Sequence, residues 1–201
     1  MENINIFGSG RHADDCISYY ATKALLKDYD EYERFIKGCE HAVRKDDRYT
    51  AYVGKLKSHG LDRCAILGNI KNDSKVSLEM HHGPIFNLFD ICDIVTRALL
   101  NRGEKELTTF DVGDAVLTQH EKDNIMIVML SKTPHKGAHV NLFIDIKSTF
   151  GRIDRFIDEY EDGMIEEHWD FLSRYLDMCA SAPSTMDNGL FDTANRLKSF
   201  K

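Results

Sequence analysis

The sequence predicts an α+β fold, in which an antiparallel hairpin and one helix form a small core within a mostly helical chain. Residues 76–81 alternate between apolar and polar side chains, which is typical of a half-buried strand. Residues 125–130 are six consecutive apolar residues, a length and composition that favour a buried strand. A helix is predicted directly after the second strand, because Thr133 can cap it and Pro134 suits a first helical position.

The N-terminal region, residues 1–60, is predicted to be helical from about His12 to His59. Apolar side chains recur there at helical spacing, first around Tyr20 and then around Phe35. Gly60 ends this region. The apolar faces of these helices leave two alternatives open, because they can pair two copies into a homodimer or cover the small core.

Residues 61–148 are predicted to hold the core, with a short apolar strand at Cys64–Gly68 before the hairpin. A helical insertion of about residues 87–121 separates the two hairpin strands. Its first helix begins at Asn87 or Asp90, and a cap at Thr108 or Thr109 starts its second.

Two acidic amphipathic helices, about 149–161 and 164–180, are predicted for the C-terminal region, residues 149–201. From Ser181 onward the pattern is weak, which is typical of a loose tail. The acidic helices offer a surface for a protein partner, although a charge run of this kind is more often a solvated helix face.

The charge balance argues against a protein that holds nucleic acid through its overall charge. The 201 residues include 26 Lys and Arg against 33 Asp and Glu, a net charge of −7. Residues 151–201 alone carry 6 basic and 11 acidic side chains. A polyanion is therefore expected to bind the first three quarters of the chain, through a local basic groove.

The expected location is the cytoplasm, or the host cytoplasm if a phage encodes the chain. Five scattered cysteines without a CxxC pair are typical of a reduced compartment. The first ten residues, MENINIFGSG, lack the basic-then-apolar pattern of a signal region. No apolar run approaches the roughly 20 residues of a membrane span, so no membrane association is expected.

Four of the nine histidines fall at one place in the predicted fold. His81 and His82 end the first hairpin strand, whereas His135 and His139 lie four residues apart on the helix after the second strand. Positions i and i+4 share a helix face, so both imidazoles can point at one metal ion. The other histidines, including His120 and His168, are isolated and are interpreted as ordinary surface or helix-end residues.

The stretches LEMHH at 78–82 and MLSKTPHKGAH at 129–139 resemble the HNH, or ββα-metal, endonuclease family. The resemblance covers about residues 61–145, and the connecting region and later segments also resemble HNH-like proteins of tailed phages. It implies a small ββα-metal core, with His81, His135 and His139 as metal ligands and His82 as the general base. Asn124 lies nearest to the place of the family's central asparagine, which braces the loop that carries the base.

The implied activity is metal-dependent cleavage of DNA with one divalent ion, Mg²⁺, Mn²⁺, Ni²⁺ or Zn²⁺. Three neutral imidazoles leave open positions on such an ion for phosphate oxygens, and a free imidazole can take a proton from water. Three lysines flank the site segments and are predicted to contact the substrate: Lys75, Lys132 and Lys136. If His82 is not the base, His120 and Glu79 are the next groups to test.

Two other interpretations of the histidines remain open. They can form a structural zinc site, or they can simply be partly buried side chains without a metal. The chain can also be a catalytically lapsed relative of the HNH nucleases that regulates a host or phage process through protein or nucleic-acid contacts. The acidic balance and the displaced asparagine favour this alternative.

Overall fold

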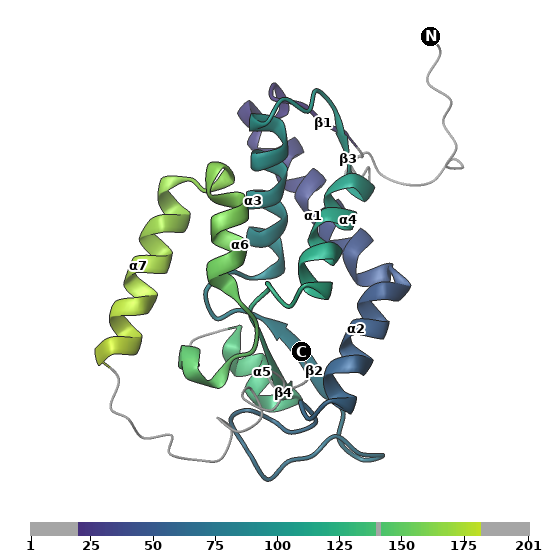
Figure 1. Cartoon of the computed structure of the whole chain (residues 1–201), viewed down its shortest axis with the longest axis vertical. Coiled ribbons are helices and arrows are strands. Elements are labelled where there is room, and N and C mark those ends of the chain that lie inside the picture. Colours follow the sequence, from purple (N-terminus) through teal and green to yellow (C-terminus); the bar gives the residue numbers. More distant parts are fainter. Residues whose placement is uncertain (1–19, 140–141, 182–201) are drawn as a thin grey trace.

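The computed structural model describes residues 20–139 and 142–181 and has the predicted α+β architecture (Figure 1). The helices are α1 (Tyr29–Lys45), α2 (Asp47–Ser58), α3 (Leu88–Asn101), α4 (Thr109–Glu121), α5 (Lys132–Ala138), α6 (Ile153–Tyr160) and α7 (Glu166–Ser181). Short 3-10 turns are η2 (Leu25–Lys27), η3 (Ile146–Ser148) and η4 (Glu161–Gly163). The strands are β1 (Tyr20–Ala21), β2 (Leu78–His82), β3 (Leu107–Thr108) and β4 (Ile127–Ser131).

The predicted hairpin pairing is confirmed. Strands β2 and β4 pair antiparallel, with His81 opposite Val128 and His82 opposite Ile127. All five residues of β4 are buried, which explains why its first four residues, Ile127 to Leu130, are apolar without alternation. Helix α5 packs against both strands and completes the predicted hairpin-and-helix unit (Figure 1).

Helices α3 and α4 occupy the stretch of chain between β2 and β4. Asn87 caps α3 and Thr108 caps α4, each in a capping box with the carboxylate three residues later. The side chain of Asn87 accepts a hydrogen bond from the backbone N–H of Asp90, and the Asp90 carboxylate accepts one from the backbone N–H of Asn87. Thr108 and Asp111 make the same two hydrogen bonds at the start of α4. The structure thus decides between the two cap candidates of each helix, in favour of Asn87 and Thr108.

The core forms where α1, α3 and α4 pack against one another, above the β2–β4 sheet (Figure 1). The apolar face of α1 lies inside this core, with Phe35, Ile36 and Cys39 fully buried. The sequence left open whether the apolar faces of the N-terminal helices pair two copies of the chain or cover its own core. The apolar face of α1 covers the core of its own chain. None of the helices in the described part of the chain combines the length and apolar character that a membrane span requires.

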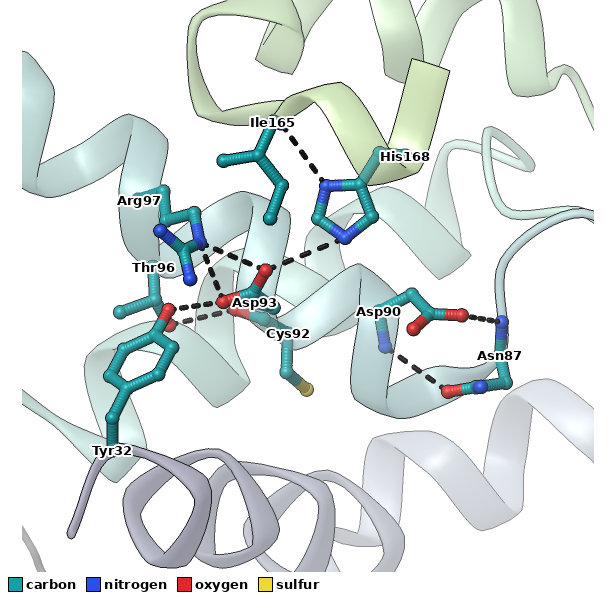
Figure 2. A network of polar contacts seen from close by, with 9 residues as sticks. All are labelled: Tyr32, Asn87, Asp90, Cys92, Asp93, Thr96, Arg97, Ile165 and His168. Atoms are coloured by element: carbon teal, nitrogen blue, oxygen red, sulfur yellow. Dashed lines mark hydrogen bonds and ion pairs between the residues drawn. The ribbon is translucent and has the colours of Figure 1, made fainter. Parts of the chain in front are cut away.

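A buried polar cluster ties α1, α3 and α7 together (Figure 2). Asp93 on α3 accepts hydrogen bonds from the hydroxyl of Tyr32 and, at 2.8 and 2.9 Å, from Nε of Arg97. Nε2 of His168 on α7 lies 3.4 Å from Oδ2 of the same Asp93 carboxylate. Since the backbone N–H of Ile165 donates to Nδ1 of His168, the ring proton sits on Nε2 and points at Asp93. The cluster therefore anchors the start of α7.

Three local expectations are wrong. Residues 20–28 form β1 and η2 rather than a long helix, and Cys64–Gly68 is an irregular segment rather than a strand. Its backbone bonds diverge, because Cys64 N–H donates to Ile70 and Ala65 N–H donates to Met129. Helix α5 begins at Lys132, so Thr133 lies inside it and is not its cap.

Other expectations lie outside the described residues. These are the start of the predicted N-terminal helix, residues 12–19, and almost all of the predicted tail, residues 182–201. The two predicted C-terminal helices are present as α6 and α7, with η4 between them.

Candidate metal centre

Three predicted ligands lie together at one end of the β2–β4 sheet. His81 comes from β2, His135 lies on α5, and His139 is the residue that caps the C-terminal end of α5. One nitrogen of each ring lies within 4.8 Å of the corresponding nitrogens of the other two. His81 is buried and His139 is exposed, so the cluster opens from the edge of the sheet to solvent.

The two adjacent histidines of β2 point to different sides of the strand, as consecutive strand residues do. The ring of His81 contacts the rings of His135 and His139, at centroid distances of 5.1 and 4.8 Å. The ring of His82 instead contacts His120 on α4 and Tyr49 on α2. The chain thus separates the three candidate ligands from the candidate base.

Glu79 orients one of the candidate ligands. Glu79 lies two residues before His81, on the same face of β2. Its carboxylate accepts a hydrogen bond from Nδ1 of His135. An imidazole that carries its proton on Nδ1 in the uncharged form holds its free lone pair on Nε2. A carboxylate on the outer nitrogen is the usual support for a metal-binding histidine.

One pair of ring nitrogens in the cluster has the spacing of two ligands on one metal ion. Nε2 of His135 and Nε2 of His139 lie 3.2 Å apart. Two ligand nitrogens at about 2.0–2.1 Å from a tetrahedral zinc are separated by about 3.3 Å. Burial, reinforced by the neighbouring rings of His139 and His135, lowers the pKa of His81 to about 4. His81 is therefore neutral near pH 7, the state in which an imidazole binds a metal.

His82 is nearly sealed by its neighbours. Only 4% of it is exposed, and its Nε2 lies 2.9 Å from Nε2 of His120. The Tyr49 ring stacks on it at a centroid distance of 6.0 Å. Burial lowers the pKa of His82 well below the usual imidazole value, so the ring is neutral and able to accept a proton at neutral pH.

Asn124 lies just before the predicted second strand, residues 125–130, and its side chain faces the insertion. Its side-chain amide donates to Oε1 of Gln119 on α4 at 2.8 Å, and its backbone N–H donates to the Gln119 carbonyl. Its Oδ1 is the one buried side-chain oxygen or nitrogen in residues 20–139 and 142–181 without a hydrogen-bond partner. The described contacts of its carboxamide therefore run to α4, and none of them reaches the loop after His82.

A cavity of about 830 Å³ opens beside the histidines. His81, His82 and His139 line one part of it, and α7 supplies another wall. Its remaining lining is mostly apolar and aromatic, with the following side chains among its members: Phe86, Phe143, Phe171 and Tyr175. A cleft of this size with a few converging polar groups is typical of a ligand site.

The three predicted substrate lysines lie outside this cavity. Lys75 precedes β2, Lys132 begins α5 and Lys136 lies on α5, and all three are exposed. Among the described residues, Arg174 of α7 is the one lysine or arginine in the cavity lining. Sequence spacing gave no indication of Arg174, because α7 is separated from the histidine segments by a long stretch of chain.

The buried histidines make stability depend on pH. Burial lowers the pKa of His120 to about 4, whereas an unfolded imidazole titrates near 6.5. Between these values the unfolded chain binds a proton that the folded chain does not, so stability falls as the pH falls. His81 and His82 act in the same direction. Burial raises the pKa of Asp90 to about 6, and this carboxyl acts in the opposite direction over the same interval.

We therefore expect the metal-free protein to lose stability between about pH 6.5 and pH 4. The difference between the folded and unfolded pKa of His120 alone corresponds to about 3 kcal/mol. Urea unfolding followed by circular dichroism at a series of pH values, with chelator present, measures the slope. His120→Gln should reduce that slope, and a stability that is constant over this range would contradict the assignment of buried neutral histidines.

Comparison with known proteins gives one match. A family model described as bacteriophage G278-like virion protein matches residues 3–198, nearly the whole chain. No curated protein and no solved structure matches the chain. The match includes the candidate metal centre, the insertion and α7. The chain therefore belongs to the bacteriophage G278-like virion protein family.

Proposed function

We propose that this virion protein is a metal-dependent DNA endonuclease. The observation that carries the proposal is the convergence of His81, His135 and His139 beside a separate, neutral His82 at the wall of one cavity. The hairpin-and-helix unit that holds them has the arrangement implied by the resemblance to the HNH family. Membership in a virion protein family supports a site of action linked to the phage particle.

Each side chain has a distinct role in the proposed hydrolysis. His81, His135 and His139 would hold one divalent ion, and Glu79 would keep the His135 ring in its ligating orientation. When bound, the ion supplies Lewis-acid stabilisation of the phosphate and of the leaving 3′ oxygen. His82 takes a proton from the attacking water. The products are a 5′-phosphate and a 3′-hydroxyl.

The cavity supports the proposal that a short segment of a nucleic acid strand enters the site as substrate. Its aromatic lining offers faces for bases, and Arg174 offers a charge for a phosphate. Asp90 and Glu167 also line it, so the cavity does not gather polyanions by charge alone. We expect the exposed Lys132 and Lys136 on α5 to contact the DNA strand outside the cavity.

A plasmid-nicking assay tests the proposal. Supercoiled DNA is incubated with the protein and Mg²⁺, Mn²⁺, Ni²⁺ or Zn²⁺, with chelator as the negative control. Conversion to open circles by the wild type, but not by His135→Ala prepared in the same way, is the expected result. Absence of nicking with every ion would contradict the nuclease.

The second candidate function is that of a lapsed nuclease that binds protein or nucleic acid. The near-complete burial of His82 and the turn of the Asn124 carboxamide toward Gln119 favour it. Under this alternative the protein binds DNA or a protein partner with the same affinity whether or not His82 is present. Binding measured for wild type and His82→Ala, beside the nicking assay, separates the two functions.

Replacing Glu79 with glutamine is expected to weaken metal binding by about 10–100-fold, the usual cost of losing an outer partner of a ligating histidine. The amide is a weaker acceptor for Nδ1–H of His135, so the ring loses its fixed orientation. Calorimetric titration with Zn²⁺ measures the affinity. Glu104→Gln, in the exposed loop after α3, is the matched control. Equal affinities in both variants would show that Glu79 has no orienting role.

A further inference from the structure

The ring of His120 has a defined tautomer. It is fully buried on α4, and its Nδ1 lies 2.8 Å from the carbonyl oxygen of Val116. A carbonyl oxygen only accepts hydrogen bonds, so Nδ1 of His120 carries the proton. Burial keeps this ring neutral near pH 7, because it lowers the pKa of His120 to about 4. Nε2 of His120 is therefore a hydrogen-bond acceptor.

That acceptor fixes the neighbouring ring. Nε2 of His82 lies 2.9 Å from Nε2 of His120, and since His120 accepts there, His82 must donate. Donation to His120 thus places a proton on Nε2 of His82 and leaves Nδ1 as the ring nitrogen that can hold the lone pair. Edge contacts of Tyr49 and Tyr52 with the His120 ring, at 5.8 and 5.5 Å, hold the pair in place.

The other nitrogen of His82, Nδ1, makes no hydrogen bond within the described part of the chain. His82 lines the cavity beside the candidate ligands. A water molecule in that cavity can donate to this lone pair.

We propose that His120 is a positioning residue that holds His82 in the Nε2–H tautomer and thereby presents Nδ1 as the proton acceptor of the site. This inference rests on the proposed nuclease function for its catalytic consequence, but not for the tautomer itself. It assigns a task to the insertion: α4 supplies the group that orients the base, although 37 residues lie between His82 and His120 along the chain.

Nitrogen NMR tests the tautomer without reference to activity. The metal-free protein, labelled with ¹⁵N-histidine, is recorded in long-range ¹H–¹⁵N spectra near pH 7.5, and the spectrum of His82→Gln assigns the His82 signals. We expect His82 as the Nε2–H form and His120 as the Nδ1–H form. A His82 ring protonated on Nδ1, or one that exchanges between both tautomers, would overturn the proposal.

Two variants test the consequence. His120→Leu fills similar space without an acceptor, whereas the Oε1 of His120→Gln can still accept from Nε2–H of His82. We expect the leucine variant to lose the single tautomer and to cleave DNA about 10–100-fold more slowly in kcat, with KM and metal affinity unchanged. The glutamine variant should restore both the tautomer and most of the rate.

The outcomes separate the two proposals. Equal losses in both variants, or a leucine variant that keeps the His82 tautomer, would show that His120 fills space and orients nothing. If the leucine variant fails to fold, the wild-type tautomers and the glutamine variant still decide. If the wild type cleaves no DNA, the nuclease proposal fails while the NMR result stands by itself.

Discussion

Replacing His135 with alanine is expected to abolish tight metal binding and, with it, DNA cleavage. The change removes one of three candidate ligands and leaves the Glu79 carboxylate without its ring partner. The loss of affinity should exceed the roughly 10–100-fold effect of removing an outer partner alone. Elemental analysis after dialysis and calorimetric titration with Zn²⁺ measure it.

Lys136→Ala is the matched control for this experiment, because Lys136 lies next to His135 on the same short helix and is exposed. It should retain the full metal content. If His135→Ala also retains it, the ligand assignment is wrong, whatever the activity of the protein.

Replacing His82 with alanine is expected to lower the rate of DNA cleavage by about 10²–10⁴, the usual contribution of a positioned general base. The metal content should not change, because the His82 ring faces His120 and Tyr49 rather than the three candidate ligands. Nicking rates and elemental analysis of the same preparation provide both measurements. His82→Gln fills more of the buried space and checks that a slow rate does not come from collapse of the core.

The pH dependence offers a second signature of His82. A base loses activity when it becomes protonated, so the rate should fall on the acid side of its pKa. Because burial lowers that pKa, the fall should lie below the ordinary imidazole range rather than within it. An active His82→Ala variant with an unchanged profile would show that another group is the base. Glu79 and His120 are then poor substitutes, since each already partners another histidine.

The sequence predicted the elements whose local signals agree with their packing. The apolar run at 125–130 and the alternation at 76–81 predicted two strands, and burial on both faces of β4 confirms the reason for the run. Cap candidates at Asn87 or Asp90 and at Thr108 or Thr109 predicted two helix starts, and the structure places the caps at Asn87 and Thr108, each in a capping box. The i, i+4 spacing predicted that His135 and His139 lie together.

The sequence could not predict what depends on contacts between distant segments. The apolar side chains of Cys64–Gly68 suggested a strand, but this segment has only scattered backbone partners and enters the core as a loop. Thr133 suggested a cap, but Ser131 precedes the helix and its hydroxyl pairs with the Cys64 thiol instead. His120 looked isolated because only the packing of α4 beside β2 brings it to His82.

The long connection between β2 and β4 has a consequence for how the chain folds. An ordinary hairpin closes over a few residues, whereas 44 residues lie between these two strands. Closing a loop of that length costs roughly 3 kcal/mol of chain entropy before any strand pair forms. Helices α3 and α4 make local contacts and are expected to form early, and their packing shortens the gap that the strands must close. We therefore expect the histidine site to assemble late, when most of the chain is already in place.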